Sequence, residues 1–531
     1  MRLIHSVTLS SPDINARHRA SQRVRAGLRW RQRAPRAARL AAAVAGLVAV
    51  CGYLFVAVSR LAYPFPLEWL EGNSLVEVHR ILAGQPLYQA PTVQYVPDGY
   101  PPLYFALSAV AARLLGVSYL PLRLVSLVSS LACFALLARL VHRETGSIAA
   151  GAGAAGVFAA TYFATDTWFD VGRVDSLFLA LSIGGLYAAR WMRGPGGAIA
   201  AGVLLAAAAL TKQTGLGEAA VVSAVLLAGP RRGLACAAVL AEFMVLAVST
   251  LVLGLSSGGW YVYYVFQLMG EHSLNVSGFG WFWTALLSTV GMAAGAALLG
   301  ARRVPLVLLA GCGALAAEGY AALVHSGGAI NDVLPAYLAV ALLAGLALGC
   351  QSSWWAPSAA GVLLFAQSVV LLTGFQPAQQ VPGSADRAVG ERLLSGMRAL
   401  GGTIAVPADP GLSLLAGMAP TAHQDAAYDV LRATDQAAIA SFMRSAASAV
   451  AARQFSAIIT DSPGVPLGYP PSLSRYYRQC PQPLLAGVPA ALFDPVAGVL
   501  ARPAYVWLPA GRGSCAAAVS VLDGASGVSH S

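Results

Sequence analysis

Apolar runs long enough to cross or nearly cross a bilayer recur along the chain, and they constrain its fold more than any other feature. A spanning helix needs about 20 predominantly apolar residues. Only 11% of the residues are charged and 57% are hydrophobic, whereas soluble domains carry about 25% charged residues. The sequence therefore predicts an all-α polytopic membrane protein with about 11 to 13 transmembrane helices. The runs lie at about 40–60, 102–141, 147–165, 175–191, 196–210, 214–229, 233–255, 281–300, 304–324, 333–350 and 354–373.

Basic residues between these runs predict the orientation of the chain. Positive loops stay in the cytoplasm, and the formal charge of +11 comes largely from an arginine-rich stretch at 17–39 and from short loops. This pattern explains the charge without nucleic-acid binding, which we exclude. The basic region is too long for a cleavable signal peptide, so residues 1–39 are predicted to be a cytoplasmic tail. The other basic loops contain His142 and Arg143, Arg190 to Arg193, Arg231 and Arg232, and Arg302 and Arg303.

The alternate loops then face the outside, together with everything beyond the last apolar run. These external loops are 61–101, 166–174, 211–213, 256–280 and 325–332. Two full spans within 102–141 would invert every later loop, so one helix of that pair is expected to lie laterally or to be partly inserted, unless the basic-loop rule fails there.

The composition changes after residue 375, where the chain becomes more polar. The segments GGTIAVPADP and FSAIITDSP predict short strands, and residues 425–450 predict helix. We therefore expect a transmembrane domain at 40–375 and a small extracytoplasmic α/β domain at 376–531. If this domain lies outside the cell, Cys480 and Cys515 are the plausible disulfide pair, although spacing alone does not fix the pairing.

Ionisable residues gather in the predicted external loops. The first loop carries Glu68, Glu71, Glu77 and Asp98, and the second places Asp170 and Asp175 around Arg173. Such carboxylates can act as a general base or bind a divalent metal, and we consider Glu71, Asp170 and Asp175 as possible metal ligands. The alternative is that they are ordinary hydrated loop residues.

Two later turns also carry polar groups. Lys212 is the only lysine in the chain, and it lies between two apolar runs. A charged group at that depth is a functional candidate, suited to binding phosphate, or a lysine that reaches the interface along its aliphatic stem. His325 and Asn331 lie in the external turn VHSGGAIND.

Three stretches resemble the GT-C superfamily of polyprenyl-phosphate-sugar-dependent glycosyltransferases, in particular its family 39-like members. These include protein O-mannosyltransferases, lipid A aminoarabinose transferases and rhizobial lipopolysaccharide sugar transferases. Glu71 stands nine residues before Arg80, and the loop closes on Tyr100-Pro-Pro-Leu-Tyr, like the family's acidic first loop and PPL-aromatic motif. Asp175 and Thr211-Lys212-Gln213 resemble two later motifs. The family's first aspartate is a glutamate here, and its lysine before the PPL motif is Tyr100.

This resemblance implies transfer of a sugar, with inversion, from a polyprenyl-phosphate donor to an extracytoplasmic glycan, lipid or protein in a bacterial plasma membrane. Glu71 would be the general base. The resemblance leaves a divalent metal open. The remaining roles would be donor-phosphate binding by Lys212, Arg173 and Arg123, and positioning of donor or acceptor by Glu68, Asp170, Asp175, Tyr100, His325 and Asn331.

Two other functions fit the same composition. A transporter or flippase of lipid-linked sugars would explain buried charge, but it favours inverted repeats, and none is visible in the sequence. A membrane scaffold whose C-terminal domain binds partners would leave unexplained the acids, arginines and lysine gathered on one face.

Overall fold

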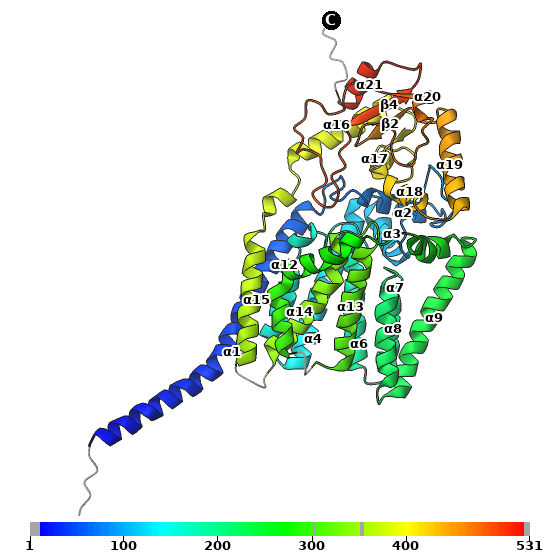
Figure 1. Ribbon diagram of the computed structural model, residues 1–531. Coiled ribbons are helices and arrows are strands. Elements are labelled where there is room, and N and C mark those ends of the chain that lie inside the picture. The colour runs from blue at the N-terminus through cyan, green and yellow to red at the C-terminus, as the bar shows by residue number, and fades with distance from the viewer. Residues whose placement is uncertain (1–10, 301–303, 351–354, 525–531) are drawn as a thin grey trace, which may run out of the picture.

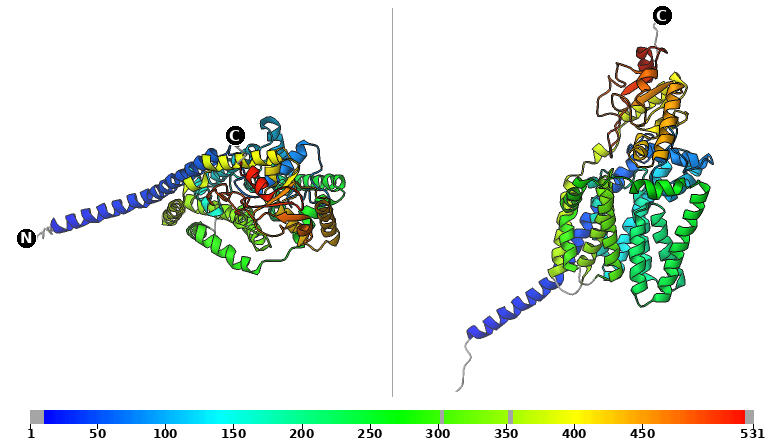
Figure 2. Two further views of the ribbon diagram at one scale, coloured as in Figure 1. Left: turned by 90° about the horizontal axis from the view of Figure 1, so that it is seen from above. Right: turned by 45° about the vertical axis from the view of Figure 1, so that its right-hand side comes forward.

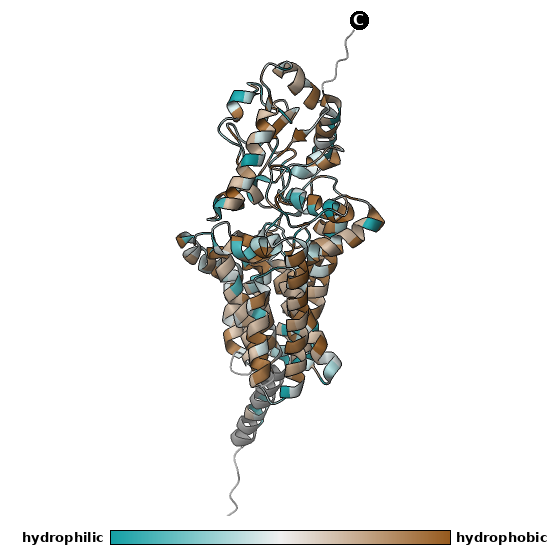
Figure 3. Cartoon of the chain, turned by 90° about the vertical axis from the view of Figure 1, so that its right-hand side faces the viewer, coloured by the Kyte–Doolittle hydropathy of each residue, from teal (hydrophilic) through white to brown (hydrophobic). Residues whose placement is uncertain are grey.

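A bundle of long helices carries a smaller mixed domain at one end (Figure 1). The computed structural model describes residues 11–300, 304–350 and 355–524. Coloured by hydropathy, the bundle is predominantly apolar, while polar residues concentrate in the smaller domain (Figure 3). The predicted fold class, a polytopic helical membrane protein with a small C-terminal α/β domain, is confirmed.

Seven helices in the described residues are long and apolar enough to cross a bilayer. They are α1 (Ser11–Arg60), α4 (Tyr119–Thr145), α9 (Arg232–Ser256), α12 (Val276–Gly300), α13 (Leu306–Val324), α14 (Leu334–Gly349) and α15 (Trp355–Thr373). Shorter helices pack among them, namely α5 (Ile148–Ala160), α6 (Asp175–Trp191), α7 (Pro195–Ala209) and α8 (Gly215–Ala228). The chain is therefore an integral, multi-pass membrane protein.

Small residues let these helices approach closely. A Cβ atom added to Gly156 of α5 would lie 1.9 Å from the Cα atom of Gly46 in α1. Membrane helices pack through such small residues because lipid offers no hydrophobic drive for their association. The Gly-rich sequence of α5 thus brings α1 and α5 into backbone contact.

The predicted basic loops lie together at the end of the bundle opposite the C-terminal domain. Arg190 Nε lies 2.7 Å from Glu144 Oε1, beside the loop that follows α4. Arg231 donates to the carbonyl oxygen of Met192 at 3.0 Å. Arg302 and Arg303 lie outside the described residues.

The segment 102–141 contributes one crossing helix. Helix α3 (Leu103–Leu115) has 13 residues, and the amide of Leu103 donates to Leu210 at the external end of α7. The next helix, α4, starts at the same level, because Tyr119 hydrogen-bonds Asp409 of the C-terminal domain at 3.5 Å. Both ends of α3 therefore lie on one side, as the basic loops required.

Helix α1 continues across residue 39, where the sequence predicts the boundary between the N-terminal tail and the transmembrane domain. It runs without interruption from Ser11 to Arg60 and passes through Pro35. Its N-terminal part projects beyond the bundle (Figure 2). The apolar run at 40–60 is thus the second half of one long helix.

The C-terminal domain combines a four-stranded sheet with helices. The strand order is β1-β2-β4-β3, with β1 parallel to β2 and the other pairs antiparallel. The two predicted strands are β1 and β2. The elements are α16 (Ser384–Leu400), β1 (Ile404–Ala405), α17 (Pro410–Leu415), α18 (Gln424–Leu431), α19 (Gln436–Ala451), β2 (Ala457–Thr460), α20 (Leu473–Tyr476), β3 (Tyr477–Gln479), β4 (Tyr505–Pro509) and α21 (Cys515–Leu522).

The helix expected at 425–450 is two helices. The side chain of Asp435 accepts hydrogen bonds from the amides of Ala437 and Ala438, which begins a new helix, since an N-cap residue has non-helical backbone angles. This break turns α18 toward the membrane domain independently of α19.

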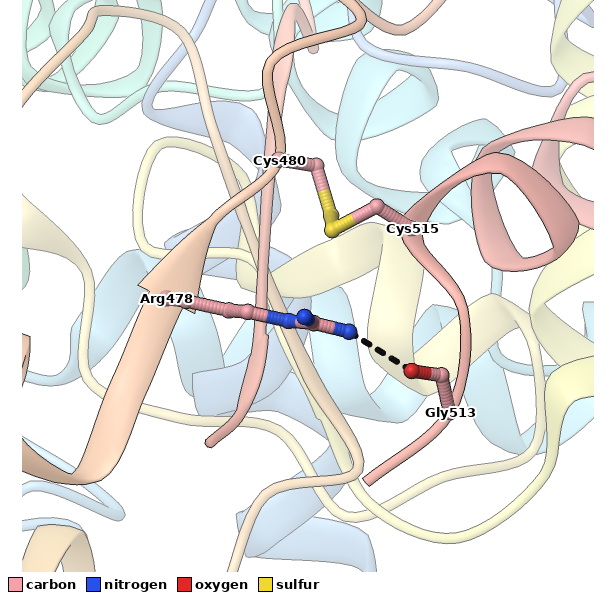
Figure 4. Close-up of a disulfide and its surroundings, with 4 residues drawn as sticks. All are labelled: Arg478, Cys480, Gly513 and Cys515. Carbon is pink, nitrogen blue, oxygen red and sulfur yellow. Dashed lines mark hydrogen bonds between the residues drawn. A yellow bond between two sulfur atoms is a disulfide. The ribbon is translucent and has the colours of Figure 1, made fainter. Parts of the chain in front are cut away.

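Cys480 and Cys515 form a disulfide that joins the end of β3 to the start of α21 (Figure 4). Nearby, Arg478 Nη2 donates to the carbonyl oxygen of Gly513 at 2.6 Å. The pairing considered from the sequence is thus the one formed.

The first external loop anchors the C-terminal domain to the bundle. The carbonyl oxygen of Leu67 accepts hydrogen bonds from the amides of Val496 and Ala497. The rings of Phe65 and Phe493 lie edge to face, with centroids 5.1 Å apart. These contacts leave a hollow between the two parts of the molecule.

Candidate active site between the membrane domain and the C-terminal domain

A cavity of about 580 Å³ lies where the external loops meet the C-terminal domain. Of the predicted site residues, Tyr100, Arg173, Lys212, His325 and Asn331 line it. Five segments far apart in sequence form most of its walls, at 69–100, 166–173, 212–214, 321–332 and 425–432, and Met269, Trp281, Gly498 and Val499 complete them. The loops at 61–101 and 166–174 thus both line the cavity, and Asp98 is the acid of those named above that lies in its wall.

Lys212 lies in the turn between α7 and α8, with its ammonium group buried between two carboxylates. Its Nζ atom is 2.9 Å from Asp175 Oδ1 and 2.9 Å from Asp332 Oδ1. Burial alone would lower the pKa of Lys212, but the two carboxylates raise it well above the ordinary value. The side chain therefore carries a fixed positive charge in the cavity wall.

Asp175 begins α6 beside this lysine. Its other oxygen accepts a hydrogen bond from Trp168 Nε1 at 2.7 Å, and Asn331 Nδ2 lies 3.4 Å from Oδ1. An acidic residue in the first turn of a helix is favoured by the helix dipole. Asp175 thus orients Lys212, Trp168 and Asn331 around one corner of the cavity.

Arg173 provides the second buried cation. Its Nη1 atom lies 3.3 Å from Asp98 Oδ2, and its guanidinium group lies 5.4 Å from the ring centroid of Tyr100. Glu68 is close behind, with Oε2 3.9 Å from Nε. Burial raises the pKa of Glu68 to about 8 despite Arg173, so Glu68 is largely neutral near pH 7.

Asp98 lines the cavity and is 7% exposed. Asn73 Nδ2 donates to Oδ1 at 2.5 Å, while the hydrogen bond of Oδ2 within the described residues is the longer one from Arg173. Burial raises the pKa of Asp98, and Arg173 partly offsets this increase. A carboxylate in such surroundings retains an acceptor position toward the cavity.

Glu71 occupies a different environment, because it is fully buried and does not line the cavity. Arg123 binds it through two hydrogen bonds of 3.0 and 2.7 Å. The amides of Leu67 and Gly172 add two more, of 2.7 and 2.5 Å. Burial raises the pKa of Glu71, but Arg123 and the amide donors outweigh it and lower the pKa overall. Glu71 therefore ties the loop at 61–101 to α4 through Arg123 and to the loop at 166–174 through the amide of Gly172.

The three carboxylates considered as metal ligands do not converge. Arg60 and Tyr162 bind Asp170, and Asp175 and Glu71 bind other cations, as described above. Within residues 11–300, 304–350 and 355–524, no three Asp, Glu, His or Cys side chains gather in a ligand set. The predicted shared metal site at these positions is thus not formed, because each acid is neutralised by its own basic partner.

His325 lines the cavity, but its imidazole ring is hydrogen-bonded to a backbone carbonyl group. Its Nε2 atom is hydrogen-bonded to the carbonyl oxygen of Met269 at 2.8 Å. The ring lies 5.2 Å from that of His272. His325 therefore fastens the loop after α13 to the segment after α11 (Leu268–Gly270).

Several lining residues were absent from the predicted site. Asp98 lies just before the PPL-aromatic motif, and Asp332 ends the turn VHSGGAIND. Their positions in these loops could therefore have identified them as site residues. Asp425, Asp429 and Arg432 come from α18 and the turn after it. No motif marks these three, because only the packing of the C-terminal domain brings them to the cavity.

Comparison with known proteins gives structural matches only. No family profile matches the chain, and no curated protein sequence matches it. ArnT from Cupriavidus metallidurans in the apo state superimposes with a TM-score of 0.49 and 15% identity, covering 70% of this chain and 84% of that one. The same protein bound to undecaprenyl phosphate gives 0.47 and 16%, covering 70% and 74%. The archaeal oligosaccharyltransferase AglB from Archaeoglobus fulgidus, in complex with an inhibitory peptide and a dolichol-phosphate, gives 0.47 and 12%, covering 79% and 69%. At this level the similarity assigns no residue a role.

Proposed function

We propose that this protein transfers a sugar from a polyprenyl-phosphate donor to an extracytoplasmic acceptor. The observation that carries the proposal is one cavity in which two buried cations, Arg173 and Lys212, adjoin the partly accessible carboxylate Asp98. The sequence resemblance to polyprenyl-phosphate-sugar-dependent transferases supports the same chemistry.

Arg173 and Lys212 would bind the donor phosphate. Preorganised cations stabilise the charge that develops on a leaving group, and they act most strongly where water is excluded. Both already neutralise carboxylates, so an incoming phosphate would share them with Asp98 and Asp175. Arg123, the third phosphate candidate from the sequence, is fully buried against Glu71 and unsuited to this role.

The donor lipid would approach from the membrane side. Trp281 of α12 and Ala321 and Ala322 of α13 belong to the cavity wall. The ring of Trp281 is 41% exposed on the outside of the bundle. A lipid-linked donor needs such a site, with a polar pocket continuous with apolar helix surfaces.

We propose Asp98, in place of Glu71, as the general base. A base must reach the proton that it removes. Asp98 lines the cavity, whereas the carboxylate oxygens of Glu71 already accept four hydrogen bonds. Asp98 would take the proton of the acceptor hydroxyl as its oxygen attacks the anomeric carbon. The bond from that carbon to the phosphate oxygen breaks, and polyprenyl phosphate leaves with the electron pair.

The test is a transfer assay in membranes that measures loss of labelled sugar from a polyprenyl-phosphate donor pool. We expect Asp98→Asn and Lys212→Ala each to lower turnover by about 100-fold or more at equal protein level. Asp494→Asn, in a carboxylate that does not line the cavity, is the matched control and should transfer normally.

A pH profile separates the two roles. Transfer by the wild type should rise with pH as Asp98 loses its proton, and Lys212→Ala should keep that profile at a lower rate. If Asp98→Asn and Lys212→Ala both turn over like the wild type, the transferase proposal is wrong, and transport of a lipid-linked sugar becomes the better explanation.

A further inference from the structure

The C-terminal domain contributes one wall of the cavity through one face of α18 and the turn after it, and its residues Gly498 and Val499 also line the cavity. Asp425, Asp429 and Arg432 line the cavity, and their spacing of four and three residues places them on one side of α18 and its following turn. Ala426 lies between them and leaves the surface open. This wall belongs to neither the phosphate site nor the base.

Three contacts fix this wall against the membrane domain. His423 caps α18 by accepting from the amide of Asp425, and its ring lies 4.9 Å from that of Trp69 in the first external loop. His272 Nε2 is hydrogen-bonded to the carbonyl oxygen of Asp429 at 2.8 Å. Arg432 Nη1 donates to Ser326 Oγ at 2.7 Å. The wall is therefore held in place before any ligand arrives.

Different charged groups surround Lys212 and Asp425. The charges that act on Lys212 include those of Asp175, Asp332 and Glu318. Those that act on Asp425 come from Asp98, Arg173 and Arg432. Asp98 and Asp425 line the same cavity, so the proposed base borders a ligand held at α18.

Asp425 and Asp429 differ in their partners. Asp429 Oδ1 is bound by Arg432 at 2.5 Å. Asp425 takes part in no ion pair within the described part of the chain, although it lines the cavity. The neighbouring Arg173, 4% exposed, has an Nε atom without a hydrogen-bond partner among the described residues. These groups offer acceptors and a donor to a polar ligand.

Carbohydrate is the ligand class that matches this wall. A sugar ring presents vicinal hydroxyl groups that donate to carboxylate oxygens, and an apolar face of C–H groups that packs on an aromatic ring. Asp425 and Asp429 provide the oxygens, and Trp69, half-buried in the same cavity, provides the ring. The two carboxylates disfavour an acceptor that enters with a phosphate group first.

We propose that α18, together with Trp69, forms an acceptor subsite for the terminal sugar of a glycan. The subsite rests on the proposed transferase function, since it holds an acceptor hydroxyl toward Asp98. The C-terminal domain is then part of the active site, and it selects a carbohydrate acceptor over a peptide.

The test is saccharide binding to the full-length protein in lipid nanodiscs, where no sugar-based detergent competes. Saturation-transfer NMR would follow mannobiose, cellobiose, lactose and maltotriose as probes, with a Ser/Thr-containing peptide as the protein-type probe. We expect at least one saccharide to bind, and Asp425→Asn to weaken that binding by about tenfold or more. Trp69→Phe, which keeps an aromatic ring, should weaken it less.

Asp494→Asn is the control, and it should bind the saccharide like the wild type. The subsite is wrong if no saccharide in the panel binds, if Asp425→Asn leaves binding unchanged, or if only the peptide binds in an Asp425-dependent way. Binding without any sugar transfer would leave the subsite standing and remove the transferase proposal, so the two failures are distinguishable.

Discussion

Carboxylates around the cavity differ in how many donors surround each of them. Glu71 receives four hydrogen bonds, two of them from Arg123, while one oxygen of Asp98 has a single long contact among the described residues. A fully satisfied carboxylate holds structure together, whereas one with spare acceptor capacity can exchange protons or bind substrate. This difference, and not position in a motif, separates the two roles.

Glu71→Gln should therefore destabilise the protein rather than act on chemistry alone. Removing one member of a buried ion pair costs about 3–5 kcal/mol, because the remaining charge stays buried without its partner. Thermal unfolding in nanodiscs should show a clearly lower Tm than for the wild type. Glu391→Gln, at an exposed position of α16, is the control and should unfold normally. An unchanged Tm for Glu71→Gln would contradict the structural role.

Glu68 makes the stability depend on pH. Its pKa is about 8 in the folded protein and about 4.3 when unfolded, so the folded state binds an extra proton between these values. This stabilisation is fully present below the unfolded pKa and is lost as pH rises through about 8. The Tm should fall as the pH rises from about 4.3 to about 8 and level off above that value. Buried Asp409, whose pKa is raised to about 7, adds to the same trend.

The Glu68→Gln side chain has nearly the shape of a protonated glutamate, but it does not titrate. The Tm of this variant should fall less steeply over the same pH range, and Asp409 and Asp429, whose pKa values burial raises to about 7, contribute to the remaining slope. A variant whose Tm follows the wild type at every pH would show that Glu68 is not the titrating group.

At the scale of elements, length and end contacts decide which helices cross the bundle. The 13 residues of α3 rise about 20 Å, and both ends lie at the external face. In the C-terminal domain, the cap at Asp435 separates α18 from α19. A continuous helix would have carried Asp429 and Arg432 past the cavity.

The disulfide between Cys480 and Cys515 joins two elements that are 35 residues apart. A cross-link of this span constrains the unfolded chain by about 3–4 kcal/mol. Cys480→Ser should lower the Tm of the C-terminal domain and increase its susceptibility to protease. Cys133→Ser, in a buried free thiol, should leave the domain's protease resistance unchanged. The bond would be refuted if maleimide modifies Cys480 and Cys515 without prior reduction.

At the scale of the whole molecule, the basic loops and the C-terminal domain occupy opposite ends. The positive-inside rule therefore predicts that the cavity lies outside the cytoplasm. In intact cells, an impermeant thiol reagent should label Asp166→Cys, exposed beside the cavity, and should label Arg193→Cys only after permeabilisation. The opposite pattern would place the cavity in the cytoplasm and remove an extracytoplasmic acceptor.

The sequence alone determined the membrane-spanning character of the chain, the end at which its basic loops gather, and the mixed domain after residue 375. These features depend on the hydrophobicity and charge of short segments, because each segment partitions between lipid and water according to its own composition. Lys212 was identifiable for the same reason, as a lone charge between apolar runs.

Only the tertiary structure decided which acid faces the cavity. Arg123 meets Glu71 across 52 residues, and Asp425 reaches the cavity from a separate domain. The burial of a carboxylate and its ion pairing depend on packing between distant segments. Both shift its pKa more than its neighbours in sequence do. The motif around Glu71 was therefore visible in the sequence, but its saturation by Arg123 and two amides was not.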